Sequence, residues 1–284
     1  MHPLLNLCQT ADITKKSDIY ISKHIANTTA WDTLAIAQPA DPLFALSDQA
    51  TTAAQVQHLI QYIDQDTVLL DYGCGYGRIA TQLLPVVSMA GYIGLDSSHE
   101  MLKLFRERVD HFDSDPATPL LLLNADINNP PLQTNTIDLV VATAVFRHNH
   151  KSVVKQAVHE LARVVRPGGR VLVYRAFPRV WTLMGLQGQL YQIALNLLGR
   201  PFKNGPDRYY TQGEVRRLFV DFSSIELIPA GFAVIPPKLC VLPRPLQILW
   251  QRYIATPINT ILHKLTPTAL QHHFATHIDV VAKR

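Results

Sequence analysis

Residues 68–78 read VLLDYGCGYGR, an apolar run that ends at an acidic residue and continues into glycines at every second position. The run Thr67–Tyr72 predicts a buried strand, and Gly73, Gly75 and Gly77 predict a tight turn leading into a helix. Because glycine reaches positive φ and has no Cβ, the N–H groups of such a turn can approach a ligand closely. The spacing GxGxG matches neither the dinucleotide pattern GxGxxG nor the phosphate pattern GxxxxGK[ST]. The loop therefore disfavours NAD and ATP, and taken alone it could be a turn used only for packing.

Strand-like and helix-like segments alternate after this loop. Further strands are predicted over Tyr92–Asp96, Leu120–Asn124, Ile137–Thr143 and Arg170–Tyr174. Helices are predicted over Gly77–Ser88, His99–Phe112 and Ser152–Arg166, the last ended by Pro167-Gly168-Gly169. This alternation predicts a parallel α/β sheet covered on both faces. Ligands bind such sheets beyond the carboxyl ends of the strands, so the loops at those ends should carry the chemistry.

Two further carboxylates follow predicted strands. Asp96 lies about twenty residues after the glycine loop, where it can accept hydrogen bonds from two ribose hydroxyls. Asp126 follows the third strand, where it can accept a hydrogen bond from an adenine amino group. Alone, each aspartate would more often be a turn or helix-capping residue. Together with Asp71 and the glycines, they predict a nucleoside site at three adjacent strand ends.

These segments resemble the class I S-adenosylmethionine-dependent methyltransferase family, especially its branches that modify small molecules, quinones or sterols. Residues 68–78 resemble the first motif of the family, 94–102 its ribose-binding motif and 125–127 its adenine-contacting motif. Residues 137–141 resemble its fourth strand, and 160–169 its later helix-to-strand turn. The resemblance implies S-adenosyl-L-methionine as cofactor. It also implies a Rossmann-like, doubly wound sheet of seven strands ordered 3-2-1-4-5-7-6, with strand 7 antiparallel.

The resemblance further implies a set of site residues. The implied cofactor-binding residues are Asp71, Gly73, Cys74, Gly75, Gly77, Asp96, Ser97, Met101, Asp126, Ile127 and Thr143. Asp71 and the glycine loop would hold the methionine end, Asp96 the ribose, and Asp126 with Ile127 the adenine. His148 follows the fourth strand, where many members carry a histidine, and it is the candidate catalytic acid or base. Tyr72 replaces a commonly aliphatic residue, and Phe146–His150 departs from the usual Leu-His pair.

The resemblance to the family also implies how the rest of the chain is divided into an extension, a domain and insertions. We expect an N-terminal extension over residues 1–50 and a methyltransferase domain over 51–284. Its last two strands would be Ile225–Ile235 and His277–Lys283, preceded by a helix over Gln212–Phe222 with Thr211 as its cap. Helical insertions would occupy about 177–207 and 236–273.

Each insertion contains an apolar helix, predicted over Val180–Leu198 in the first and Leu246–Leu265 in the second. Between Glu226 and Asp279 the chain has no acidic residue, although it has four lysines and arginines there. A basic, amphipathic face with Trp250 and Tyr253 would suit an anionic membrane surface or an apolar acceptor, so residues 236–273 predict a peripheral membrane contact. The alternative is a lid packed on the sheet, which is the commoner use of such helices.

Composition narrows the class of protein. With 284 residues and 48% hydrophobic composition the chain can bury a full core, and its net charge of +4 is too small to indicate a nucleic-acid binder. Cys8, Cys74 and Cys240 form no disulfide framework, which fits a reducing cytosol. We find no export signal and no apolar run long enough to span a membrane, so we expect a cytoplasmic protein. No metal is expected, since His159-Glu160 continues to Arg163 where a zinc protease needs a second histidine.

We therefore predict transfer of a methyl group by in-line displacement to an oxygen or carbon of a small, apolar acceptor. Two alternatives stay open. An RNA methyltransferase would use a phosphate track of Arg175, Arg179, Arg200, Lys203, Arg208, Arg216 and Arg217. A non-catalytic S-adenosylmethionine-binding protein would keep the cofactor loop and lack an acceptor pocket. The sequence carries no signal for an oligomeric state.

Overall fold

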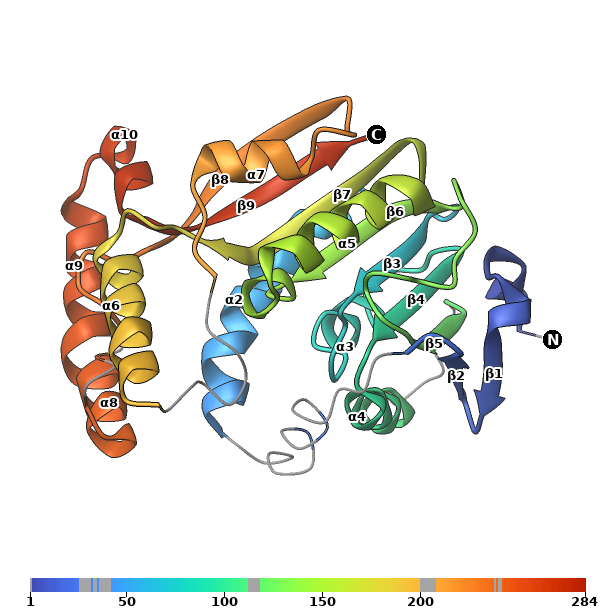
Figure 1. Ribbon diagram of the computed structural model, residues 1–284, viewed down its shortest axis with the longest axis horizontal. Helices are drawn as coiled ribbons and strands as arrows, with labels where there is room; N and C mark the ends of the chain where they lie inside the picture. The colour runs from blue at the N-terminus through green and yellow to red at the C-terminus, as the bar shows by residue number, and fades with distance from the viewer. Residues whose placement is uncertain are drawn as a thin grey trace.

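One sheet with helices on both faces forms the body of the protein (Figure 1). The computed structural model describes residues 2–25, 32, 35, 42–111, 118–199, 208–237, 239 and 242–284, with backbone alone for 42–50 and 244. Its strands are β1 (Ile13–Lys16), β2 (Ile19–Ser22), β3 (Val68–Tyr72), β4 (Gly91–Asp96), β5 (Leu120–Asn124), β6 (Ile137–Thr143), β7 (Val165–Pro178), β8 (Ser224–Phe232) and β9 (Ala275–Lys283).

The strands lie in the order β1-β2-β5-β4-β3-β6-β7-β9-β8. The six strands from β2 to β7 in this order are parallel, whereas β1 is antiparallel to β2, and β9 is antiparallel to both β7 and β8. The prediction of a Rossmann-like, doubly wound α/β sheet is confirmed. The carboxyl ends of β3 to β7 therefore meet at one edge, as a nucleoside site requires.

The prediction of a seven-stranded sheet is wrong, because the sheet has nine strands and its order begins with β1 and β2. These two strands form a hairpin within the predicted N-terminal extension, and Ile19 and Ile21 of β2 pair with the free edge of β5. Leu4, Leu5 and Cys8 are buried against the same end of the sheet. An unpaired edge of β5 would leave its N–H and C=O groups without partners, and the hairpin supplies them.

The α-helices are α2 (Pro42–Ile60), α3 (Ala80–Leu83), α4 (His99–Asp110), α5 (Lys151–Val164), α6 (Leu183–Leu197), α7 (Gln212–Leu218), α8 (Arg244–Trp250), α9 (Thr256–Leu265) and α10 (Thr268–Gln271). Side chains alternate along each strand, so Leu70 and Tyr72 belong to the core under α5, whereas Leu69 belongs to the core under α2, α3 and α4. The sheet thus separates two apolar cores, each closed by helices.

Two predicted boundaries differ from the observed ones. The helix expected over Gly77–Ser88 is reduced to α3, because Gly77 has a φ of +77° and Pro85 follows the last turn. The segment Pro167-Gly168-Gly169 does not separate helix from strand but forms an irregularity inside β7, where the register with β6 shifts. Its backbone is paired with Arg284, which donates to Gly169 and accepts from Gly168.

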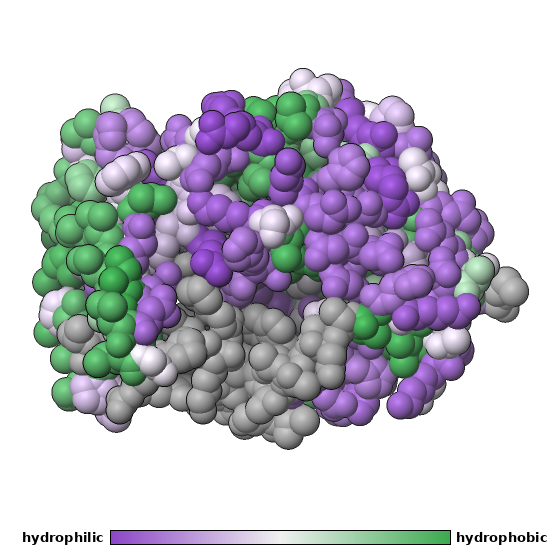
Figure 2. Space-filling model, viewed as in Figure 1, coloured by the Kyte–Doolittle hydropathy of each residue, from purple (hydrophilic) through white to green (hydrophobic). Residues whose placement is uncertain are grey.

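The two predicted insertions form α6 and the run α8 to α10, beyond the edge of the sheet where β7 and β8 end (Figure 1). Figure 2 shows hydrophobic residues gathered over these helices. Between α8 and α9 the chain continues through a π-helical turn, Gln251–Ala255, which precedes Pro257. Proline has no N–H to donate, which loosens the ladder of helical hydrogen bonds before it. No helix among the described residues is long and apolar enough to cross a membrane.

A capping box between Thr211 and Glu214 begins helix α7. The Thr211 hydroxyl accepts a hydrogen bond from the N–H of Glu214 at 3.2 Å, and the Glu214 carboxylate accepts one from the N–H of Thr211 at 2.8 Å. We expect Thr211→Ala to lower the free energy of unfolding by about 1 kcal/mol, because helix N–H groups lose their acceptor. Urea unfolding checks this, with Thr211→Ser as the control that keeps the hydroxyl. Equal stability of the alanine variant and the wild type would contradict the capping role.

Candidate active site

The glycine loop after β3 is folded against the end of β4. The N–H groups of Gly73 and Cys74 donate to the carbonyl of Leu95 at 2.8 and 3.0 Å. Gly73, Gly75 and Gly77 have φ of +78°, +53° and +77°. A Cβ at Gly73 would overlap Val145, and one at Gly77 would overlap Phe105, whereas one at Gly75 would meet nothing within 4 Å. Gly75 therefore borders open space, as a loop that lies against a ligand must.

Asp96 connects this loop to the start of α4. One carboxylate oxygen accepts the N–H of Gly75 at 2.8 Å, and the other accepts the N–H of Ser98 at 2.8 Å. Burial raises the pKa of Asp96, and the Asp32 carboxylate nearby adds to the shift. The N–H of Ser97 also interacts with this carboxylate, which can accept about four hydrogen bonds, so it keeps an acceptor position for a ribose hydroxyl. Ser98 caps α4 by accepting the N–H of Met101 at 3.2 Å and donates its own hydroxyl to Asp32 at 2.6 Å.

The end of β5 is hydrogen-bonded to the loop after β4. The Asn124 side-chain amide donates to the carbonyls of Asp96 and Ser97 at 3.0 and 2.9 Å. Asp126 accepts the N–H of Asn128 at 2.8 Å in a turn that starts the following loop. Ser97 and Asp126, which the sequence assigns to the cofactor, therefore lie on neighbouring loops at one edge of the sheet, and Met101 lies in the first turn of α4 after the first of these loops.

Tyr72 departs from the family pattern for a structural reason. Its side chain is fully buried, and its hydroxyl donates to the carbonyl of Ile127 across the sheet. An aliphatic residue could not make this bond, so Tyr72 positions the loop that carries Asp126 and Ile127. Sequence reasoning identified the departure but not the bond, because only the fold brings the ends of β3 and β5 together.

Asp71 lies inside the fold and not at the surface of the site. Its side chain is 1% exposed, and its carboxylate accepts the Tyr92 hydroxyl at 2.6 Å. Burial raises the pKa of Asp71 to about 7, against the lowering effect of the Tyr92 hydrogen bond. The role of Asp71 at the methionine end of a cofactor stays a prediction, while its bond to Tyr92 links β3 to β4.

Thr143 and His148 follow β6. The Thr143 hydroxyl oxygen is buried and has no hydrogen-bond partner among the described residues, so it is a polar group left for a ligand. His148 ends a single turn of 3-10 helix, Phe146–His148, and is half-buried. It does not line the cavity described next. The open space at Gly75, the spare acceptor position of Asp96 and the Thr143 hydroxyl together fit a nucleoside-bearing cofactor.

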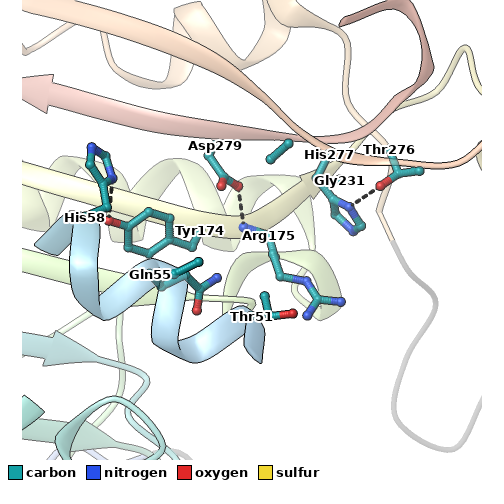
Figure 3. A pocket seen from close by; sticks show the side chains of 11 residues that line it. Thr51, Gln55, His58, Tyr174, Arg175, Gly231, Thr276, His277 and Asp279 are labelled. Atoms are coloured by element: carbon teal, nitrogen blue, oxygen red, sulfur yellow. Dashed lines mark hydrogen bonds between the residues drawn. The ribbon is translucent and has the colours of Figure 1, made fainter. Parts of the chain in front are cut away.

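A cavity of about 390 Å³ lies between α2 and the ends of β7, β8 and β9 (Figure 3). His58 from α2 and Tyr174 from β7 meet in it, with 2.9 Å between the His58 Nδ1 and the Tyr174 hydroxyl. On its other side the N–H of Arg175 donates to the Asp279 carboxylate at 2.7 Å. Burial raises the pKa of Tyr174 and raises that of Asp279 to about 6. At neutral pH Tyr174 thus stays a protonated hydroxyl within hydrogen-bond distance of His58.

The cavity is connected to the glycine loop by one arginine. Arg78 immediately follows Gly77 and donates to Thr52 at 2.9 Å and to Gln55 at 3.5 Å, and Gln55 lines the cavity. Sequence reasoning missed these residues of α2. The spacing of Thr51, Gln55 and His58 places them on one helix face, and this signal could have been found.

The described arginines of the predicted phosphate track have different surroundings. Arg179 donates to the carbonyls of His272 and Ala275 at 2.6 and 3.0 Å, and the main-chain N–H of Arg175 is bound at the cavity. Arg216 and Arg217 are exposed on α7, and Arg200 and Lys203 lie outside the described residues, as does Cys240. Within the described part of the chain, no three His, Cys, Asp or Glu side chains are grouped to hold a metal ion.

Comparisons with known proteins point to the same chemistry. A family model for a methyltransferase domain matches residues 69–169. The ubiquinone/menaquinone biosynthesis C-methyltransferase UbiE of Laribacter hongkongensis is 31% identical over 169 residues, which cover 58% of this chain and 66% of that protein. An uncharacterised protein in a Streptomyces fradiae transposon is 38% identical over 105 residues, covering 37% of this chain and 28% of that protein. The chain thus spans less than two thirds of the length of each of these relatives.

Solved structures share the fold. One is a chain from a complex between the Haloferax volcanii Trm112 methyltransferase activator and a methyltransferase. It aligns with a TM-score of 0.57 at 15% identity, covering 89% of this chain and 96% of that chain. Geranyl diphosphate methyltransferase aligns with a TM-score of 0.51 at 13% identity, covering 82% of this chain and 78% of that chain. At such identities the likeness concerns the fold alone.

Gly75→Ala and Gly77→Ala form a matched pair of variants. Both glycines have positive φ, so both substitutions carry a similar backbone cost, but only the Cβ at Gly77 meets Phe105. We expect Gly77→Ala to lower the free energy of unfolding by about 1–3 kcal/mol more than Gly75→Ala does. We expect Gly75→Ala to weaken binding of S-adenosylmethionine roughly tenfold, because its methyl group occupies the ligand side of the loop. Thermal unfolding and calorimetric titration check this, and the reverse ranking of stabilities would be contrary to the geometry.

The buried Asp71 predicts a pH dependence of stability. A carboxyl group whose pKa rises from 3.8 to about 7 on folding binds its proton more tightly in the folded state. Its contribution to stability is therefore complete below the unfolded value and is lost as the pH rises through the folded value. We expect the free energy of unfolding of the wild type, measured relative to Asp71→Asn, to decrease across this window. Urea titrations at several pH values test it, and a constant difference would count against a raised pKa.

Proposed function

Because the chain carries a class I S-adenosylmethionine-dependent methyltransferase domain, we propose that it methylates an oxygen or carbon of a small, apolar acceptor held in the cavity beside His58 and Tyr174. The family assignment also confirms the predictions of an enzyme and of S-adenosyl-L-methionine as its cofactor. The identity of the acceptor, the place where it binds and the roles of individual residues belong to our proposal.

The observation that carries the proposal is the link from the glycine loop to the cavity. Arg78 extends the loop and holds Gln55, whose neighbour on the same helix face is His58. A site for the cofactor and a separate, polar-lined space for an acceptor are thus joined by one side chain. A protein that only bound the cofactor would have no need of the second space.

The chain's own residues have three tasks in such a reaction. When bound, S-adenosylmethionine would supply an electrophilic methyl group to the acceptor atom, with S-adenosylhomocysteine as the leaving group and the acceptor's proton removed by the protein. The glycine loop, Asp96 and Thr143 would hold the cofactor, and the cavity walls would align the acceptor and exclude water. The acceptor's proton would pass to the Tyr174 oxygen as the Tyr174 hydroxyl proton passes to the His58 Nδ1.

Several sequence-based assignments enter the proposal with changes. His148 is replaced by His58 as the candidate base, because His58 lines the cavity and His148 does not. We keep the catalytic domain at 51–284, with insertions at about 177–207 and 236–273, and propose that these insertions border the acceptor. The RNA alternative loses support, because Arg179 is engaged with main-chain carbonyls and Arg175 lies at the cavity.

A small aromatic acceptor with a ring hydroxyl is favoured by two observations. The relative from Laribacter hongkongensis is named as a ubiquinone/menaquinone biosynthesis C-methyltransferase, and the cavity contains a tyrosine–histidine pair. A ring hydroxyl gives the pair a proton to remove, which makes either the oxygen or the adjacent ring carbon nucleophilic. A peripheral contact of residues 236–273 with a membrane would bring such an acceptor close.

The experiment measures methyl transfer from labelled S-adenosylmethionine to a panel of hydroquinones and phenols. We expect His58→Gln and Tyr174→Phe each to lower kcat by about 10²-fold, because proton removal is lost, while calorimetric binding of S-adenosylmethionine stays unchanged. Asp96→Ala is the opposite control, with cofactor binding lost.

Tyr62→Phe is the matched variant, because the Tyr62 hydroxyl is 3.5 Å from the other His58 nitrogen and does not line the cavity. We expect it to reduce kcat far less. Cofactor binding with no turnover on any acceptor would favour the non-catalytic alternative. Turnover that is insensitive to both cavity variants would show that the acceptor binds elsewhere.

A further inference from the structure

Helix α6 presents a row of large apolar side chains to solvent. Its exposed members recur at intervals of three and four residues, which places them on one helix face: Leu183, Leu186, Leu190, Ile193 and Leu197. Their exposed fractions range from 43% to 83%, and Trp181, just before the helix, is 74% exposed. In an ordinary surface helix such an apolar face would be buried. The apolar face of α6 is exposed in this structure, so it is open to a partner that could cover it.

The run from α8 to α9 repeats this arrangement. Its most exposed apolar side chains are Leu246, Leu249, Tyr253, Ile261 and Leu265, with exposed fractions from 48% to 74%, and Ile248 and Ile254 are exposed to 36% and 42%. The opposite side of the run packs on the chain, since Ala255 and Asn259 are buried and Asn259 bonds the backbone of residues 234 and 235. The exposed residues are therefore the outer face of a fixed helix.

Trp181 and the ten most exposed apolar residues of these two helices are called the docking face below. Both helices extend from the edge of the sheet where β7 and β8 end, and hydrophobic residues dominate this side of the molecule in Figure 2. Scattered apolar residues are normal on protein surfaces, but apolar rows on both insertions exceed that pattern and indicate a binding surface.

The charged residues around the docking face indicate which kind of partner surface it fits. Residues 161–206 and 227–278, which contain both helices, have no aspartate or glutamate. The second segment has four lysines and arginines, of which Arg252 and Lys264 are exposed on the same helical run. Arg252 lies over the Tyr253 ring at 5.5 Å, so a cation borders an exposed aromatic residue. Apolar rows with cations and no anions are complementary to a bilayer that carries anionic headgroups.

A second copy of the chain fits this face less well. A two-fold contact would place the face against itself, so cations would meet cations with no carboxylate from either segment between them. The chain continues from α9 through α10 and the 3-10 turn His272–Phe274 to Thr276, which lines the cavity.

We propose that the docking face is a peripheral membrane-binding surface, in which α6 and the α8–α9 run lie in the interface of an anionic phospholipid bilayer. The helices do not span it. The bilayer would cover the exposed leucines and isoleucines, while Arg252 and Lys264 contact lipid phosphates. Given the proposed function, the same contact would place the cavity next to the phase in which an apolar acceptor dissolves.

The test is flotation of the full chain with vesicles of phosphatidylcholine alone or with about one-third phosphatidylglycerol. We expect the wild type to float with the anionic vesicles and to be released by high salt in part. Tryptophan fluorescence reports the contact independently: it should shift to shorter wavelength with anionic vesicles, and the shift should be smaller in Trp181→Phe, which keeps Trp31 and Trp250. Calorimetric binding of S-adenosylmethionine on the same preparations keeps this result separate from the proposed reaction.

Two sets of variants locate the contact. Leu190→Asp and Leu249→Asp should each weaken vesicle binding about tenfold, whereas Val220→Asp, at a 77% exposed residue outside the face, should not. Arg252→Glu and Lys264→Glu should each weaken binding to anionic vesicles about fivefold, with Arg216→Glu on α7 as the control.

Outcomes of two kinds would overturn the proposal. One is absence of flotation in a preparation that binds S-adenosylmethionine, or flotation that the leucine variants leave unchanged. The other is a dimer in sedimentation velocity that Leu190→Asp and Leu249→Asp convert to monomer while vesicles bind neither form, which would assign the face to self-association.

Discussion

The hydrogen bond from the N–H of Gly75 to the Asp96 carboxylate holds the site together. It joins the loop after β3 to the end of β4, and the second carboxylate oxygen continues the link to Ser98 and the start of α4. A carboxylate with two main-chain donors is held in one orientation, even though burial raises its pKa. The adjacent glycines can follow this path because their φ angles are positive. Everything proposed for cofactor binding depends on this geometry.

Two buried tyrosines extend the same constraint. Tyr92 donates to Asp71 and ties β4 to β3, while Tyr72 donates to the carbonyl of Ile127 and ties β3 to the loop after β5. Each hydroxyl satisfies a buried acceptor that would otherwise be left without a partner. Three strand ends thus form one rigid edge, on which Asp96, Asp126 and the glycine loop keep their relative positions.

The acceptor side is built differently. Its cavity takes residues from α2, β7, β8 and β9, which lie between Thr51 and Asp279 in the sequence, and Arg78 joins it to the cofactor loop. The insertions that follow β7 and β8 carry the docking face, and we propose that they border the acceptor. The rigid edge would thus serve a cofactor common to the family, while the variable helices would select and deliver the acceptor.

Local patterns in the sequence determined the strands from β3 to β7, the capping box of Thr211 and the nucleoside loop, because each depends on neighbours within a few residues. They did not reveal the β1–β2 hairpin, whose short strands are stabilised by pairing with β5. The bond of Tyr72 to Ile127, the burial of Asp71 and the meeting of His58 with Tyr174 were also decided by tertiary structure alone. Each joins residues far apart in the chain, and no local spacing encodes a contact made only when parallel strands end at one edge.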